Sequence, residues 1–456
     1  MTEVESLAAF VTRARCEDMS EAARLQIRIR VLDSIGCAIG ALDGEPMGPL
    51  GAQLDEFGGN GLCTVIGRAG KTSPDRAAFH NGALVRYLDF MDAYLAKGET
   101  CHPSDNLAPV MAAAEYAGAD GRTLLTALAV AYQVQARLSD EAPVRDRGFD
   151  HTTQGAFAVG AGIAKALGLD QARAAHAIAL AGTGNVALRV TRTGALSQWK
   201  GLAYANTSFS ASHAAFLAMR GITGPSQVFE GNKGFKDSVS GAFAIDWGSE
   251  DLERVCRTAM KKFDAEIHAQ SAIEGLLDLK SRHGFEAAQV ACIEVDIFDV
   301  AHKIIGGGEE GDKTRVSTKE QADHSLPYML AAALCDGDLQ PAQYTPDRIA
   351  APDVQDLLRR VHVRSDAYLS ARFPEELSCR IGVVLRGGRR LVVDKRDYEG
   401  FPSRPMSWEH VCRKFHGLAA PFIPAERRDA IAEVVWRLDG GTARDLTALL
   451  GATPHT

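Results

Sequence analysis

Cysteine motifs are missing from this 456-residue chain, although nine cysteines are present. The cysteines are scattered, no C-x-x-C occurs, and the nearest pair in the sequence is Cys16 and Cys37. Zinc ribbons, iron–sulfur runs and disulfide scaffolds need closely or regularly spaced cysteines, so all three are disfavoured. The pattern fits a protein of the reducing cytosol.

Long apolar runs and an excess of basic residues are also missing. No segment approaches about twenty uninterrupted apolar residues, so we expect no membrane span. The N-terminal sequence, MTEVESLAAFVTRARCEDMS, resembles neither a secretory signal nor a transit peptide. A formal net charge of −8 argues against a general nucleic-acid binder, which would show a basic stripe. We therefore expect a cytoplasmic protein with no nucleic-acid partner and no membrane partner.

Nucleotide-binding loops are the third absence. The phosphate-binding pattern G-x-x-x-x-G-K-[ST] does not occur. A literal G-x-G-x-x-G begins at Gly306, but Glu309, Glu310 and Asp312 would repel a pyrophosphate. The chain also has no H-E-x-x-H pair for zinc. We expect neither an organic cofactor nor a metal.

Helical patterning dominates the first ~260 residues. In EAARLQIRIRVLDSIGCAIGAL, apolar residues recur at threes and fours between Leu25 and Leu42, which predicts one buried helical stripe. Asp170 stands where it would cap one of the Ala-rich helices that follow. These expected helices cover residues 105–118, 121–138, 151–167, 170–182, 198–220 and 225–231.

The pattern changes after about residue 270. VACIEVDIFDV alternates Ile293, Val295 and Ile297 with acidic residues, which predicts a half-buried strand. RVHVRS is a second short strand, and CRIGVVLRGGRRLVVDKRDY predicts a hairpin that turns at Gly387-Gly388. A single helix, HSLPYMLAAALCDG, lies between these strands, and the tail is helical again.

These elements predict a mostly α protein with two domains, as the chain length also favours. We expect a large all-helical domain from residues 1–270 plus 401–456. A smaller α+β lid domain is inserted at residues 271–400. Clefts between domains are favoured sites for small ligands.

The segment RYLDFMDAYLAKGETCHPSDN concentrates chemically active side chains. Asp89 and Asp92 would share a face if a helix continued through them. With His102 they could hold a divalent metal, although no fixed-geometry ligand pair is present. Cys101 could be a nucleophile, but in an extended loop it points away from His102. An acid/base centre needs only one carboxylate and one imidazole, and a solvated loop is the alternative without chemistry.

Further polar residues stand at the ends of expected helices. FDHTTQGAFAVGAG places His151 before a small-residue helix, and LSQWKGLAYAN places Lys200 at the start of another. RVTRTG supplies Arg189 and Arg192 between them. Each also has an ordinary explanation, since lysines are mostly exposed and a histidine often serves as a polar cap.

The second half of the chain contributes two more segments. FDAEIHAQSAIE carries Glu266 and His268 near the expected domain junction. EQADHSLPYML carries His324 and Tyr328 at the start of the helix in the smaller domain. One histidine alone is usually structural, but four at the ends of elements favour a functional site.

Taken jointly, the segments RYLDFMD, HPSDN, FDHTTQGAFA, WKGLAYAN, AEIHAQSAIE and ADHSLPY resemble the MmgE/PrpD family. They occur in the family's order, and the likeness runs from about residue 5 to about residue 430. The resemblance implies an all-helical domain, a smaller α+β lid, an active site between them and a homodimer. The family includes 2-methylcitrate dehydratases, cis-aconitate decarboxylases and an iminodisuccinate epimerase, which act on small polycarboxylates without a metal or organic cofactor.

Matching the family's motifs residue by residue assigns a role to each candidate. The implied catalytic residues are Asp89, His102, His151, Lys200 and His268, with Glu266 as the alternative to His268. The implied substrate-binding residues are Lys200, Arg192, Tyr328 and His324.

Dehydration of 2-methylcitrate or citrate is the activity that the resemblance favours. Some decarboxylases carry a threonine where this chain has Ala93, and YLAKGETCHPSDN looks more like the dehydratase branch. We expect Asp89, His102 and His151 to transfer protons while Lys200 holds a carboxylate, although the sequence does not assign acid and base. Decarboxylation, epimerisation and a non-catalytic polycarboxylate-binding paralogue are the alternatives.

Overall fold

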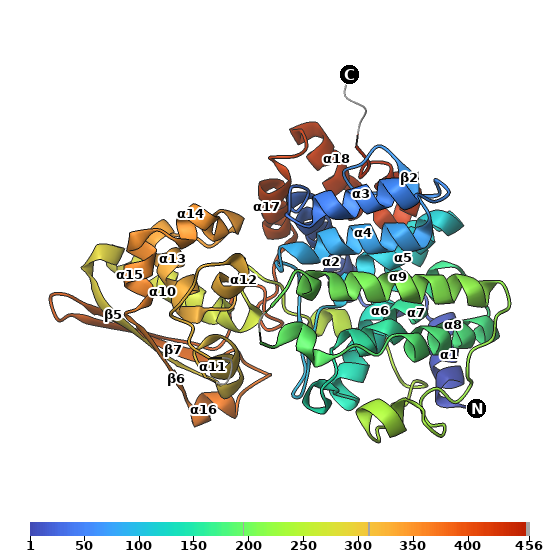
Figure 1. Cartoon of the computed structure of the whole chain (residues 1–456), viewed down its shortest axis with the longest axis horizontal. Coiled ribbons are helices and arrows are strands. Elements are labelled where there is room, and N and C mark those ends of the chain that lie inside the picture. The colour runs from blue at the N-terminus through green and yellow to red at the C-terminus, as the bar shows by residue number, and fades with distance from the viewer. Residues whose placement is uncertain (195, 309–310, 453–456) are drawn as a thin grey trace. The chain divides into compact units, whose positions relative to one another are not determined.

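A computed structural model describes residues 1–194, 196–308 and 311–452. Glu309 and Glu310, named above for the glycine-rich loop, lie outside the described residues. The chain divides into two compact units (Figure 1). Unit 1 is Met1–Thr258 with Ser407–Thr456, and unit 2 is Ala259–Met406.

Unit 1 is built from α-helices, which include most of those expected from the sequence. Its two short ladders pair β1 (Cys63–Thr64) with β2 (Lys71–Thr72), and β3 (Tyr94–Leu95) with β4 (Thr100–Cys101). Its helices are α1 (Glu3–Arg13), α2 (Glu21–Gly40), α3 (Met47–Phe57), α4 (Pro74–Tyr87), α5 (Leu107–Ala117), α6 (Gly121–Glu141), α7 (Thr152–Ala166), α8 (Gln171–Gly184), α9 (Trp199–Met219), α17 (Trp408–Ala419), α18 (Ala425–Trp436) and α19 (Ala443–Thr447).

The structure confirms the predicted cap at Asp170 and contradicts one predicted helix. Asp170 caps α8, because its carboxylate accepts from the amide of Arg173 at 2.9 Å. The helix expected at 225–231 is wrong, since these residues form turns. Only one helix-like turn forms there, in which the amide of Gly231 donates to the carbonyl of Gln227 at 2.8 Å, because a segment of seven residues is too short to sustain a helix by itself.

Helix α7 packs against α5, α6, α8 and α9, and α4 packs against α5 and α9 (Figure 1). Their alanines and glycines let the backbones approach closely: a Cβ added at Gly160 of α7 would lie 3.1 Å from the Cβ of Ala181 on α8. Helix α2 is buried on every side from Val31 to Ile39. The sequence pattern predicted burial of only one face of this helix, so the buried surface is wider than expected. Over the described residues, no helix is long and apolar enough to cross a membrane.

Unit 2 combines helices with one four-stranded sheet in the order β6-β5-β7-β8. The β5–β6 pair is parallel and the other two pairs are antiparallel. The strands are β5 (Val290–Ile297), β6 (Val361–Ser365), β7 (Cys379–Leu385) and β8 (Arg390–Lys395). The helices are α10 (Gln270–His283), α11 (Asp299–Ile305), α12 (Lys319–Ala322), α13 (Leu326–Asp336), α14 (Pro346–Ile349), α15 (Pro352–Leu358) and α16 (Ala367–Ser370).

The strand patterns expected from the sequence are confirmed in unit 2. Ile293 and Val295 are buried, whereas the Glu294 side chain between them reaches the guanidinium of Arg390 on β8 at 2.6 Å. The hairpin turns at Gly388, whose φ of 81° is in the region that favours glycine. The mostly α fold class is therefore confirmed: among the described residues, the four-stranded sheet lies in unit 2, and unit 1 has two-residue strands in two short ladders.

The start of α6 packs directly on the C-terminal tail, which makes Gly121 intolerant of a side chain. A Cβ added at Gly121 would lie 1.5 Å from the carbonyl oxygen of Leu438. We expect Gly121→Ala to lower the free energy of unfolding by about 1–3 kcal/mol, because the tail must move to relieve the overlap. Urea unfolding of the purified variant measures this loss.

Gly417→Ala on α17 is the matched control, because a Cβ there meets no atom within 4 Å. We expect this variant to be as stable as the wild type or more stable by up to about 1 kcal/mol, since alanine favours a helix over glycine. Equal losses in both variants would contradict the steric explanation.

Candidate active site

Asp89 lies in a turn, not on a helix. Helix α4 ends at Tyr87, and Asp89 adopts a left-handed backbone with φ of 57°. The expectation that Asp89 and Asp92 share a helical face is therefore wrong. Aspartate tolerates this conformation better than most residues, and such backbone strain is common at functional sites. The Asp89 carboxylate lies 3.5 Å from the guanidinium of Arg86.

Asp92 organises the residues around His102. The Nδ1 of His102 lies 2.8 Å from the backbone oxygen of Asp92, and the Asp92 carboxylate accepts from the amide of Ser104 at 3.1 Å. A carbonyl oxygen only accepts, so Nδ1 of His102 carries the proton. Its other ring nitrogen, Nε2, is therefore the atom through which this histidine can exchange a proton with a substrate.

His151 is held by an acidic neighbour. Its Nδ1 lies 3.3 Å from a carboxylate oxygen of Asp150, and this negative neighbour favours the tautomer with the proton on Nδ1 and the lone pair on Nε2. Nε2 is buried and has no hydrogen-bond partner among the described residues. Burial lowers the pKa of His151 well below its usual value, and the cations Arg192 and Arg86 act in the same direction against Asp150. The ring is therefore neutral at pH 7.

Backbone pairing brings Arg192 beside Asp150. The amide of Asp150 donates to the carbonyl of Ala187 at 2.9 Å, and the amide of Arg189 donates to the carbonyl of Gly148 at 2.9 Å. The 3-10 turn Arg189–Arg192 follows, and Nε of Arg192 donates to Asp150 at 2.7 Å. Although burial opposes it, His151 and Arg192 hold the pKa of Asp150 below its usual range.

The rings of His102 and His151 pack edge to face in unit 1. Their centroids lie 5.7 Å apart, and the ring of Tyr204 stacks on His151 at 6.3 Å. Lys200 precedes Tyr204 by four residues on α9, so both lie on one side of that helix. Unit 1 thus combines two imidazoles, the carboxylate of Asp89 and the cations Arg86 and Arg192.

Unit 2 contains a second cluster around His268. The Glu266 carboxylate accepts from the amide of His268 at 2.8 Å and lies 2.7 Å from its Nδ1. The Nε2 of His268 is buried without a hydrogen-bond partner among the described residues. Burial by itself would raise the pKa of Glu266, but the neighbouring His268 and His324 outweigh it and lower this pKa to about 2. Glu266 thus serves as the anionic partner of His268, and both remain candidates.

The other candidates of unit 2 have protein partners of their own. His324 hydrogen-bonds through Nδ1 to Asp323, which also pairs with Lys319 at 3.1 Å. Tyr328 is fully buried, and its hydroxyl donates to the backbone carbonyl of Gln343. Substrate binding by His324 and Tyr328 stays a prediction.

The thiol and metal alternatives for the 86–106 segment have little geometric support. Cys101 is buried, its sulfur accepts a hydrogen bond from the hydroxyl of Ser139 at 3.2 Å, and burial raises its pKa well above the usual value. A reactive thiolate needs the opposite environment. Within the described parts of the chain, no three His, Cys, Asp or Glu side chains converge as metal ligands.

Several residues of these clusters were not singled out from the sequence. They are Arg86, Asp105, Asp150 and Tyr204. Each lies in one of the quoted motifs, within four residues of a predicted site residue. Glu99 was also passed over: its buried carboxylate accepts from the amides of Val144 and Arg145 at 3.3 and 3.1 Å. An acidic residue placed directly before a chosen histidine, as Asp150 is, was the available signal for a positioning partner.

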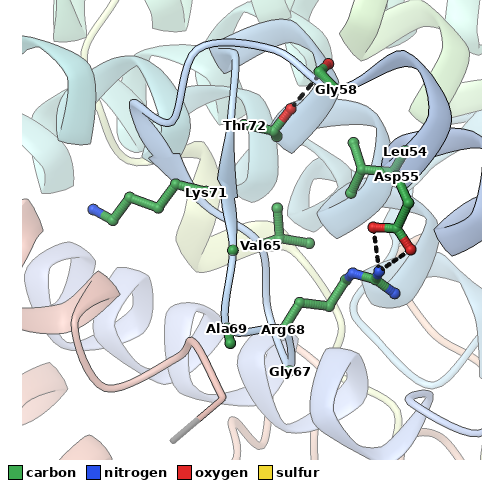
Figure 2. A pocket seen from close by; sticks show the side chains of 10 residues that line it. Leu54, Asp55, Gly58, Val65, Gly67, Arg68, Ala69, Lys71 and Thr72 are labelled. Carbon is green, nitrogen blue, oxygen red and sulfur yellow. Dashed lines mark hydrogen bonds and ion pairs between the residues drawn. The ribbon is translucent and has the colours of Figure 1, made fainter. Parts of the chain in front are cut away.

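A hollow of about 530 Å³ in unit 1 lies among other residues (Figure 2). Both oxygens of Asp55 lie 2.6 Å from the guanidinium of Arg68, and Lys71 pairs with Glu115 at 2.7 Å. Figure 2 shows Arg68 directed at Asp55 while Lys71 points away from that pair. The positive charges of this hollow are compensated, so it does not provide the cationic site that a polycarboxylate requires.

Comparisons with known proteins cover nearly the whole chain. Residues 5–248 match the model of the MmgE/PrpD N-terminal domain, and residues 263–439 match that of the MmgE/PrpD C-terminal domain. The 2-methylcitrate dehydratase of Cupriavidus necator is 31% identical over 72% of this chain and 70% of its own length. The 2-methylcitrate dehydratase of Escherichia coli K12 is 30% identical over 78% of this chain and 76% of its own length. The cis-aconitate decarboxylase of Mus musculus is 25% identical over 95% of this chain and 90% of its own length.

Proposed function

The chain belongs to the MmgE/PrpD family, and on that basis we propose that it is a hydro-lyase that removes water from 2-methylcitrate or citrate. The observation that carries this proposal is the pair of imidazoles in unit 1, His102 and His151, whose rings lie 5.7 Å apart. The Nδ1 of His102 is held by a backbone carbonyl, and that of His151 lies 3.3 Å from a carboxylate. Relatives named 2-methylcitrate dehydratase support the substrate class.

Elimination of water from such a tricarboxylate requires three actions. A base takes a proton from carbon, an acid delivers a proton to the departing hydroxyl, and cations stabilise the carboxylates and the charge that develops. The double bond forms from the electron pair of the broken C–H bond as the C–O bond breaks, so the products are the unsaturated tricarboxylate and water.

Unit 1 has groups for each of these actions. His151 is neutral with its lone pair at Nε2, which makes it a base at pH 7. We propose His102 as the acid: with Nδ1–H held by the carbonyl of Asp92, it would act in its doubly protonated form and deliver the proton of Nε2 to the departing hydroxyl. We assign Asp89 to the proton-transfer set, and Lys200 to a substrate carboxylate. Arg192 is already paired with Asp150, so its binding of substrate is a secondary proposal.

Decarboxylation of cis-aconitate is the second candidate function. The mouse cis-aconitate decarboxylase is similar over 95% of this chain, a larger share than either dehydratase covers. The same bases and cations serve that reaction, with carbon dioxide leaving in place of water. A homodimer, a cytoplasmic location and independence from metals are further proposals that follow from the family.

The test is incubation of the purified protein in D2O with 2-methylcitrate, citrate, cis-aconitate and iminodisuccinate, with products followed by NMR. We expect 2-methylcitrate or citrate to lose water, and a chelator to leave the rate unchanged. Release of carbon dioxide from cis-aconitate would establish the second candidate instead. A ligand that raises Tm but is never consumed would show a non-catalytic binder and overturn the proposal.

A further inference from the structure

Asp105 is a buried acid of unit 1 that the proposed mechanism does not use. It lies on the 3-10 turn Pro103–Asn106, directly after His102, and is 2% exposed. One carboxyl oxygen is 3.5 Å from Nη1 of Arg86. The other is buried and has no hydrogen-bond partner among the residues that the structure describes. An ionised carboxylate in such a position is costly, because half of it receives no hydrogen bond.

Arg86 serves two carboxyls at once. While Nη1 approaches Asp105, Nη2 of the same guanidinium lies 3.5 Å from Asp89. Arg86 is itself only 5% exposed, so water does little to screen these charges. When two carboxyls are held close to one cation, the better buried one tends to keep its proton. Asp105 is the better buried, because the Asp89 side chain is 15% exposed.

The other groups that face Asp105 come from three further places. Asp92 in the turn after α4 adds a like charge, and Arg192 after α8 adds an opposite one. On α9, the pKa of Tyr204 is raised by its burial and further by Asp105, so its hydroxyl stays neutral. Burial of Asp105, opposed by Arg86 and Arg192, raises its pKa to about 7.

We propose that Asp105 is a positioning residue of this site: its buried carboxyl carries a proton in the working protein, which leaves the guanidinium of Arg86 to Asp89. When Asp105 ionises, its charge competes for Arg86, and Asp89 loses part of its partner. Turnover therefore falls as Asp105 loses its proton. This effect on turnover rests on the proposed function, whereas the protonation of Asp105 does not.

The first measurement needs no substrate. Protein labelled with 13C at the aspartate carboxyls is titrated by NMR between about pH 5 and pH 9. We expect one aspartate signal to titrate with a midpoint of about 7 and to be missing in Asp105→Asn. In Asp89→Asn the same signal should titrate at lower pH, since a like charge is removed and Arg86 is no longer shared. If Asp105→Asn does not fold, the shift in Asp89→Asn decides the question.

The second measurement is the pH dependence of kcat. Asparagine resembles the protonated acid but cannot ionise, so Asp105→Asn should keep turnover at low pH and lose the alkaline decline of the wild type. A merely structural role would lower kcat equally at every pH. The proposal is overturned if no aspartate titrates near neutral pH, if the midpoint is unchanged in Asp89→Asn, or if the alkaline decline persists in Asp105→Asn. Absence of turnover with every polycarboxylate would refute the proposed function alone, because the NMR titration still decides the state of Asp105.

Discussion

Replacing His151 by asparagine is expected to lower kcat by about two to four powers of ten, the usual contribution of a positioned general acid or base. The Nε2 of His151 is buried and has no hydrogen-bond partner among the described residues, so a substrate that enters the site can use this atom as an acceptor. Asparagine keeps a polar group beside Asp150, which retains its pairing with Arg192 at 2.7 Å. Steady-state kinetics with the substrate identified by NMR measure the loss.

His80→Asn provides a matched control on α4. His80 is also a buried histidine, and its Nδ1 has no hydrogen-bond partner within the described part of the chain; burial is the main cause that lowers its pKa to about 4. Its charged neighbours are Arg68 and Asp55 at the hollow of Figure 2, not the groups around His151. We expect near-normal kcat in this variant. Similar kcat values in both variants would remove His151 from the proton-transfer set.

Replacing Lys414 by methionine is expected to have the largest effect on stability. Its side chain is 5% exposed, and its ammonium lies 2.8 Å from the carboxylate of Asp33 on α2, which is 1% exposed. It also donates to the carbonyl of Phe90 at 2.7 Å. Removing one member of a buried pair costs about 3–5 kcal/mol, because buried Asp33 then loses its nearest cation and keeps only the weaker attraction of Arg30. Urea unfolding measures the change, and the double variant Asp33→Asn with Lys414→Met should recover part of it.

Arg413→Met is the control that separates loss of the buried ion pair from the effect of placing a methionine in this part of α17. Arg413 is the exposed neighbour of Lys414, and its replacement should change the free energy of unfolding by no more than about 0.5 kcal/mol. Lys414→Met should additionally lower kcat, since Phe90 follows Asp89 directly. A Lys414→Met variant as stable as Arg413→Met would show that the buried pair contributes nothing.

Local sequence patterns determined the elements whose stability depends on near neighbours. The alternation of Ile293 and Val295 with acids predicted β5, because a strand with one buried face needs a period of two. The helix cap of Asp170 and the turn at Gly388 were also predicted, since each depends on one residue's own geometry. The sequence motifs likewise singled out His102 and His151, whose rings lie 5.7 Å apart.

Other features depend on contacts between residues far apart in the chain, and only the tertiary structure decided them. Asp89 lies in a left-handed turn and not in the expected helix. The backbone carbonyl of the next residue, Phe90, accepts a hydrogen bond from Lys414 on α17. Arg192 donates a hydrogen bond to Asp150 because the backbone around Gly148 and Asp150 pairs with the backbone around Ala187 and Arg189. The sharing of Arg86 between Asp89 and Asp105 could not be read from the motifs, although all three residues stand in the segment Arg86 to Asn106. Burial and partner distance set the charge of such groups, and a sequence motif records neither.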